Sequence, residues 1–173
     1  MKNVELYVPA LSDFWFRQQC LADSQTMSYN AGYNVEYYGY NYQTGCIDFP
    51  KSKWQEFEAK LKNPNFYFAY IVDKDKNCFV GYINYNLNPD TGKATMGVVV
   101  KSEFRGQGYM RPVLRLLIEK AKEANAKCLT DTIPTNRVGA LKVFTEFGFK
   151  VTREYVTQKF NEPEVIVQIE KEL

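Results

Sequence analysis

The chain has 173 residues, of which 45% are hydrophobic and 24% are charged; its formal net charge is +2, and it contains no histidine. This length and composition predict a single domain over residues 1–173 and exclude wholesale disorder, and no apolar run reaches the ~20 residues that span a membrane. Without histidine, catalysis must use carboxylates, tyrosines, thiols, water or backbone dipoles, and we expect no metal.

The N-terminal third predicts one strand, two helices and a long loop. Residues 1–7 alternate like a strand and carry an acidic residue, unlike a cleavable signal, so we place the protein in the cytoplasm with no membrane partner. Helical spacing follows Pro9 and again Pro50. Between them, six tyrosines with glycines and asparagines in residues 29–42 predict a loop or pocket wall.

Three strands are predicted next, at residues 66–73, 78–87 and 94–100, separated by polar turns that favour an antiparallel meander. One face of the second strand is apolar, with Phe79, Ile83, Tyr85 and Leu87, and the other carries Asn84 and Asn86.

After Gly108 the apolar period changes to that of a helix, and Pro112 must lie in its first turn. The remaining predicted elements are a strand at residues 127–132, a helix at 136–147 closed by Gly148, and strands at 149–157 and 165–170. This order predicts an α/β (α+β) fold with a mixed sheet and flanking helices.

Charge is unevenly distributed along the chain. Residues 1–50 hold two basic and five acidic residues, whereas residues 101–150 hold ten basic and five acidic ones. The basic charges are spread along a helix and its flanks, which favours a compact polyphosphate ligand over nucleic acid. The widely spaced cysteines suit neither zinc nor a disulfide framework, so we expect reduced thiols at Cys20, Cys46, Cys78 and Cys128.

The passage most informative about chemistry is the turn between the third meander strand and the following helix. It consists of Arg105, Gly106, Gln107, Gly108, Tyr109 and Met110. The glycines let a phosphate approach the backbone, and the N–H groups of the new helix favour an anion. Lys101 and Arg111 add positive charge. The spacing does not match a nucleoside triphosphate loop or a dinucleotide fold, and a tight connection without a ligand is the structural alternative.

This turn resembles the signature of the GNAT superfamily of N-acetyltransferases, in which Arg or Gln is followed by any two residues, then Gly, any one residue, and Gly or Ala. Arg105 and Gly108 match it, whereas Met110 replaces the last small residue and either crowds the turn or points into the core. Residues 136–149 resemble the family's asparagine-led helix that ends in Gly-Phe. The resemblance covers residues 66–157, an acetyl-CoA-binding core, and leaves residues 1–65 as the acceptor-side region.

The resemblance implies that acetyl-CoA lies where two parallel strands splay apart. The backbone of Val98, Val99 and Val100 would then bind the pantetheine arm, and an N–H of Val98 or Val99 would stabilise the thioester oxygen. A buried strand without a ligand would also contain these valines. The pyrophosphate contacts fall to Arg105, Gly106, Gln107, Gly108, Tyr109 and Met110, and Asn136 contacts the pantetheine or orders the wedge.

The resemblance leaves the proton transfers open. The family's usual acid is a tyrosine four residues before the Gly of Gly-Phe, and Phe144, which stands there, flanks the thiol without protonating it. A thiol of pKa about 8.5 still leaves tolerably as thiolate. The candidate bases are Glu103, Asp131 and the tyrosines of residues 29–42; we prefer Asp131, near the end of a strand that faces the cleft.

The acidic N-terminal region predicts a cationic acceptor, attracted by Asp23, Glu36 or Asp48. Tyrosine faces would pack against it, and we assign substrate contacts to Tyr29, Tyr33 and Glu36. The alternative is that these aromatic side chains form the core beneath a long loop.

We therefore expect an N-acetyltransferase that moves the acetyl group of acetyl-CoA to a primary amine by direct attack in a ternary complex, as a monomer or homodimer. Phe144 and the lack of histidine favour one alternative, a non-catalytic acyl-CoA sensor; turnover with any amine separates the two. The basic segment favours another, a nucleic-acid-binding module, whose binding would fall steeply with salt and be indifferent to CoA.

Overall fold

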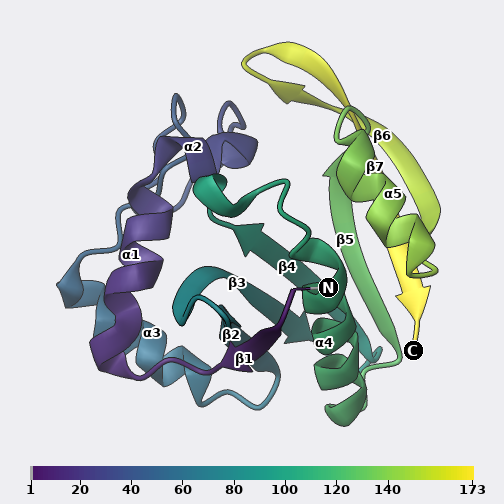
Figure 1. Ribbon diagram of the computed structural model, residues 1–173. Helices are drawn as coiled ribbons and strands as arrows, with labels where there is room; N and C mark the ends of the chain where they lie inside the picture. The colour runs from purple at the N-terminus through teal and green to yellow at the C-terminus, as the bar shows by residue number, and fades with distance from the viewer. Residues whose placement is uncertain (1) are drawn as a thin grey trace.

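Seven strands form one mixed sheet in the computed structural model, which describes residues 2–173 (Figure 1). Their spatial order is β1-β2-β3-β4-β5-β7-β6, and every neighbouring pair is antiparallel except β4 and β5. The strands are β1 (Val4–Tyr7), β2 (Phe66–Asp73), β3 (Cys78–Leu87), β4 (Lys93–Val100), β5 (Cys128–Pro134), β6 (Lys150–Lys159) and β7 (Glu162–Glu172). The helices are α1 (Phe14–Ala22), α2 (Ser24–Met27), α3 (Trp54–Leu61), α4 (Met110–Glu123) and α5 (Val138–Glu146). Within residues 2–173 no helix is long and apolar enough to cross a membrane.

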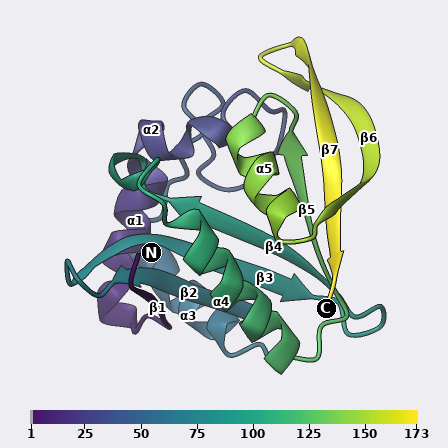
Figure 2. The same ribbon diagram turned by 45° about the vertical axis from the view of Figure 1, so that its right-hand side comes forward.

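Helices cover both faces of the sheet, with α4 and α5 on one face and α1 and α3 on the other (Figure 2). The first face buries mainly aliphatic side chains, among them Leu114 and Leu117 of α4. The second face buries aromatic rings, including Phe14 and Phe57. This architecture confirms the predicted mixed sheet with flanking helices.

The ends of two helices follow from local chemistry. α4 begins at Met110, which makes Pro112 its third residue, where a missing N–H costs no intrahelical bond. α5 begins at Val138, two residues later than predicted, because a turn closed by Arg137 N–H and the Pro134 carbonyl at 3.0 Å comes first. The predicted start, Asn136, lies in that turn.

One prediction about the two faces of β3 is wrong, because β3 contains a bulge. Ile83 and Tyr85 pack against the aliphatic core as predicted, but Phe79 packs on the aromatic side of the sheet. The pairing of β3 with β2 shifts register between Ile71 and Val72, and this shift interrupts the alternation of side chains. Val80 therefore packs on the aliphatic side of the sheet, where strict alternation would have placed Phe79.

The parallel strands β4 and β5 separate soon after they meet. Their pairing covers only residues 93–95 of β4 and 128–130 of β5. Beyond it, β4 continues to Val100 paired with β3, and β5 continues to Pro134 paired with β7. The two strands therefore diverge and leave a wedge between their C-terminal halves, as the family resemblance predicted.

A buried hydrogen bond fixes the start of α4 against the β2–β3 turn. The Tyr109 hydroxyl donates to Asp73 Oδ2 at 2.5 Å, and both residues are buried. Asp73 Oδ1 accepts the N–H groups of Asp75 and Lys76, each at 3.0 Å. The bond from Tyr109 lowers the pKa of Asp73, so the carboxylate stays ionised and fully hydrogen-bonded.

We expect Tyr109→Phe to lower Tm by roughly 3–8 °C, because the buried Asp73 carboxylate would lose its hydroxyl donor. Thermal unfolding followed by circular dichroism measures the change. Tyr38→Phe is the matched control, since that ring is 60% exposed, and it should leave Tm unchanged. Equal shifts in the two variants would contradict the structural role of the Tyr109 hydroxyl.

Candidate active site

A cleft of about 720 Å³ lies where β4 and β5 diverge. Residues 97–100 of β4 and 131–133 of β5 line it, together with the first residues of α4 and α5. The aromatic side of the sheet closes it, with α1 and α3 contributing side chains. This volume is typical of a site for a small molecule or a cofactor.

The glycine turn lies on the wall of this cleft. Gly106 and Gly108 have φ values of +73° and +86°, a region that favours glycine. A Cβ built at either position would meet no protein atom within 4 Å, so a phosphate oxygen can approach the backbone there. α4 begins at Met110 and places the positive end of its dipole beside the turn. This geometry fits a pyrophosphate.

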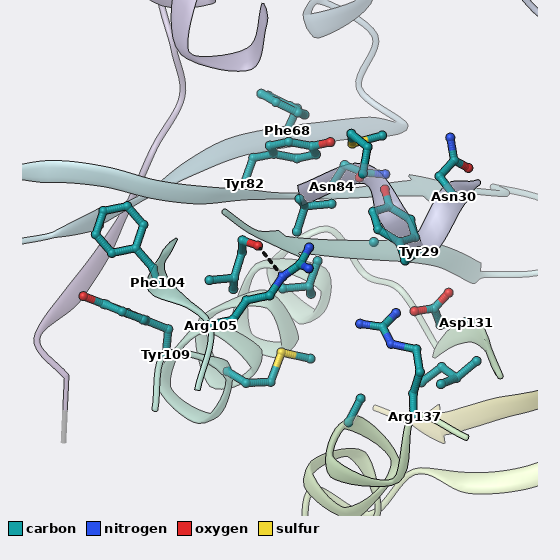
Figure 3. Close-up of a pocket in the computed structure, with 18 of the residues that line it drawn as sticks. Tyr29, Asn30, Phe68, Tyr82, Asn84, Phe104, Arg105, Tyr109, Asp131 and Arg137 are labelled. Carbon is teal, nitrogen blue, oxygen red and sulfur yellow. Dashed lines mark hydrogen bonds between the residues drawn. The ribbon is translucent and has the colours of Figure 1, made fainter. Parts of the chain in front are cut away.

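Arg105 lines the cleft, and its guanidinium also holds two segments together. Its Nε donates to the Val100 carbonyl at 3.0 Å, the hydrogen bond drawn in Figure 3. Its two terminal nitrogens donate to the carbonyls of Gln25 at 3.1 Å and Thr26 at 2.5 Å. Arg105 therefore fixes the end of β4 to α2, in addition to placing positive charge beside the turn.

Three other residues predicted in the turn direct their side chains elsewhere. The Tyr109 hydroxyl points to Asp73, and Met110 packs against the aliphatic core, although both residues also line the cleft. Gln107 is exposed and outside the cleft lining, with its Nε2 donating to the Glu103 carbonyl at 2.8 Å. Any contact of Gln107 with a ligand in the cleft would therefore have to involve its backbone.

Asp131 is the one acidic residue that lines the cleft within residues 2–173. It follows directly after the last residue of β5 paired with β4, and its Oδ1 accepts the N–H of Thr132 at 2.8 Å. Burial raises the pKa of Asp131 to about 7, although the Thr132 bond and the charge of Arg137 oppose the rise. Figure 3 shows Asp131 and Arg137 on the same side of the cleft. A carboxyl group that titrates near neutrality is suited to accept a proton.

The other candidates for catalysis differ in position. The cleft lining includes Val98, Val99 and Val100, and also Phe144, which is 3% exposed and packs its ring 5.1 Å from that of Phe149. Glu103 does not line the cleft; its carboxylate pairs with Lys101 at 2.8 Å and its side chain is 58% exposed.

Several predicted ligand contacts are not brought to the cleft. Asn136 is exposed outside its lining, and Tyr33 and Glu36 line a separate depression of about 430 Å³, where the Tyr33 hydroxyl donates to Glu164. Tyr29 does line the cleft. The carboxylates predicted to attract a cationic acceptor also lie elsewhere: Asp23 caps α2 and accepts the Ser102 hydroxyl at 2.9 Å, and neither Glu36 nor Asp48 lines the cleft.

Sequence reasoning did not single out several polar residues that line the cleft as contacts, among them Arg17, Tyr82, Asn84 and Arg137. The available signal was the alternation along β3, in which Asn84 and Asn86 lie on the polar face. Tyr82 lies on the same face as these two asparagines. No signal in α1 marked Arg17, because a single arginine in a helix is ordinarily a solvated side chain. Figure 3 shows Tyr82 and Asn84 across the cleft from Asp131 and Arg137.

Comparisons with known proteins agree with this geometry. The model of the acetyltransferase (GNAT) family matches residues 29–149. Among solved structures, spermidine N-acetyltransferase from Vibrio cholerae in complex with CoA and spermine has a TM-score of 0.79 at 14% identity, covering 98% of this chain and 95% of that chain. A putative acetyltransferase from Acinetobacter baylyi has a TM-score of 0.76 at 14% identity, covering 100% and 93%. A search of curated proteins finds no significant match.

The sheet with its diverging strands, the glycine turn and these likenesses define an acyltransferase. More specifically, the chain belongs to the GNAT family of acetyltransferases, whose model spans most of its length.

Proposed function

We propose that this protein transfers the acetyl group of acetyl-CoA to a primary amine by direct attack within a ternary complex. The observation that carries the proposal is the position of Asp131, a carboxyl group with a pKa of about 7, in the same cleft as the phosphate-binding turn. The Vibrio cholerae spermidine N-acetyltransferase, solved with CoA and spermine together, supports a coenzyme and an amine side by side in this fold.

The chain's residues would divide the reaction as follows. The turn at Gly106 and Gly108 binds the pyrophosphate, and the backbone of Val98–Val100 binds the pantetheine arm. The amine nitrogen forms a bond to the thioester carbon while Asp131 accepts its proton. A backbone N–H of Val98 or Val99 stabilises the developing oxyanion, and the C–S bond then breaks to release the thiolate. Solvent protonates the thiolate, since Phe144 carries no proton to donate.

Direct transfer is favoured over an acetylated enzyme because none of the four cysteines lines the cleft. Burial moreover raises the pKa of Cys20 to about 12, so its thiol is a poor nucleophile at neutral pH.

Calorimetric titration with acetyl-CoA, followed by a thiol-release assay with a panel of amines, tests the function. We expect micromolar binding and amine-dependent release of CoA thiol, with initial-rate lines that intersect when both substrates are varied. Parallel lines would contradict direct attack. Binding without turnover of any amine would instead favour an acyl-CoA sensor, and no binding would refute the coenzyme site.

A further inference from the structure

The acceptor side of the cleft contains a cation to which the described chain offers aromatic rings but no carboxylate. Arg17 of α1 lines the cleft, and its Nε is buried with no hydrogen-bond partner within residues 2–173. Its guanidinium carbon lies 4.0 Å from the ring centre of Phe57, 4.2 Å from Phe49 and 5.8 Å from Phe68. No side-chain hydrogen bond and no carboxylate within 4.0 Å satisfies this guanidinium in the described chain.

Such an arrangement is costly in the free protein. Aromatic faces attract a cation, but they do not replace the hydrogen bonds that a guanidinium makes with water or with a carboxylate. Burial lowers the pKa of Arg17, and the groups that oppose this effect are the side chains of Tyr82, Tyr70, Cys20 and Tyr29, which are uncharged at neutral pH. A ligand anion is the partner that this side chain lacks.

Arg17 also differs from the other cations of the cleft. Arg111 pairs with Glu146 at 2.8 Å, Arg105 donates to three carbonyls, and Lys60 is exposed with its Nζ 4.3 Å from the Phe66 ring centre. Arg137 is exposed, and its charge acts on Asp131. Arg17 is therefore the cleft cation best placed to gain a new, desolvated ion pair.

A row of side chains connects Arg17 with the reaction wedge. Phe68 of β2, which lies against Arg17, is directly opposite Asn84 of β3, and Asn84 is opposite Gly97 of β4. A Cβ at Gly97 would lie 2.8 Å from Asn84 Oδ1, so the glycine leaves room for the amide to lie over β4 beside Val98. The row offers a ligand an aromatic ring and an amide between the guanidinium and the wedge.

We propose that the acceptor is an amine that also carries a carboxylate, and that the carboxylate binds the Arg17 guanidinium. Its apolar body lies along Phe68 and Tyr82, and its amine reaches the wedge near Asp131. This inference rests on the proposed function and assigns its substrate class: ω-amino acids whose apolar body separates the amine from the carboxylate. A polyamine, such as the spermine bound by the Vibrio cholerae enzyme, carries no group for Arg17 and would bring further positive charge to a basic cleft.

Matched pairs of acceptors test the proposal. The thiol-release assay compares 6-aminohexanoate with hexylamine and 8-aminooctanoate with octylamine, and includes spermidine. In the wild-type protein we expect kcat/KM for at least one carboxylated member to exceed that of its carboxylate-free partner by roughly 30-fold or more. Arg17→Met should reduce this ratio to near 1, and Arg17→Lys should retain part of it.

Two further measurements separate recognition from folding. If Arg17 serves ligand binding, Arg17→Met puts an unbranched apolar side chain beside the rings of Phe49 and Phe57, removes a charge that has no ionic partner, and leaves Tm unchanged or higher. The dissociation constant for acetyl-CoA should not change. Lys60→Met is the matched control for the overall positive charge of the cleft. It should leave the ratio of kcat/KM values within about twofold of the wild-type ratio.

Preferred acetylation of spermidine or of the carboxylate-free amines would overturn the proposal, as would failure to acetylate any carboxylated amine. The proposal would also be overturned if the ratio of kcat/KM values between the paired amines is unchanged in Arg17→Met, or if it falls by the same factor in Lys60→Met. The proposed function fails on separate evidence, namely the absence of acetyl-CoA binding and of thiol release with every amine.

Discussion

Gly108→Val should weaken acetyl-CoA binding by about 100-fold or more, measured by calorimetric titration. Gly108 has a φ of +86°, which a β-branched residue avoids, and the new side chain would fill the open space beside the turn, where we propose that the pyrophosphate binds. The variant therefore both distorts the backbone N–H groups and blocks access to them.

The control for backbone strain is Gly148→Val, because Gly148 has a similar φ of +83° and does not line the cleft. Both variants should lose stability, but only Gly108→Val should lose coenzyme affinity. If Gly148→Val weakens acetyl-CoA binding as much, the loss reflects general destabilisation and the phosphate site at the turn is refuted.

Asp131→Asn should lower kcat by about 10²–10⁴-fold, because the amine would lose the group that accepts its proton. Asparagine keeps an oxygen that can accept the Thr132 N–H, so the local backbone should be undisturbed. In the wild-type protein, kcat should rise with pH up to about 7, where Asp131 becomes ionised, and then level off. The residual activity of Asp131→Asn should lack that rise.

Glu103→Gln tests the other carboxylate that the sequence offered as a base. Its side chain is 58% exposed and paired with Lys101, so the substitution should change kcat by less than about twofold. A large loss in Glu103→Gln with normal activity in Asp131→Asn would reverse the assignment.

The same substitution at Asp131 should stabilise the folded protein above neutral pH. Burial raises the folded pKa of Asp131 from 3.8 to about 7, so the folded state retains a proton that the unfolded state has released between these values. The native state thus loses stability from this group as pH rises from about 4 to 7. Asp131→Asn should then raise Tm by roughly 3–8 °C at pH 8 and have little effect near pH 4. Reduced activity together with increased stability would identify Asp131 as a functional group whose burial lowers the stability of the folded protein.

The sequence alone was sufficient for features that depend on neighbouring residues. Three such features report local backbone geometry: the apolar spacing after Gly108, the position of Pro112 and the glycines of the turn. The start of α4 agrees with the first two, and the positive φ values of the glycines agree with the third. The alternation along residues 66–100 likewise predicted the meander, because strand periodicity is encoded within each strand. The order of these elements was enough to predict the mixed sheet.

Packing between distant segments decided the rest. A register shift between β2 and β3 moved Phe79 to the other face, and α2 supplied the carbonyls that hold Arg105. The sequence proposed Asp131 as a base, but only its burial in the folded chain raises its pKa. The sequence of α1 did not indicate that Arg17 lacks an ionic partner. The surroundings of its guanidinium are rings from α3, β2 and the segment before α3, which only the fold brings together. Local sequence thus determined the elements and the glycine turn. The electrostatic properties of Asp131 and Arg17 became apparent only in the folded structure, since desolvation and pairing are properties of the tertiary environment.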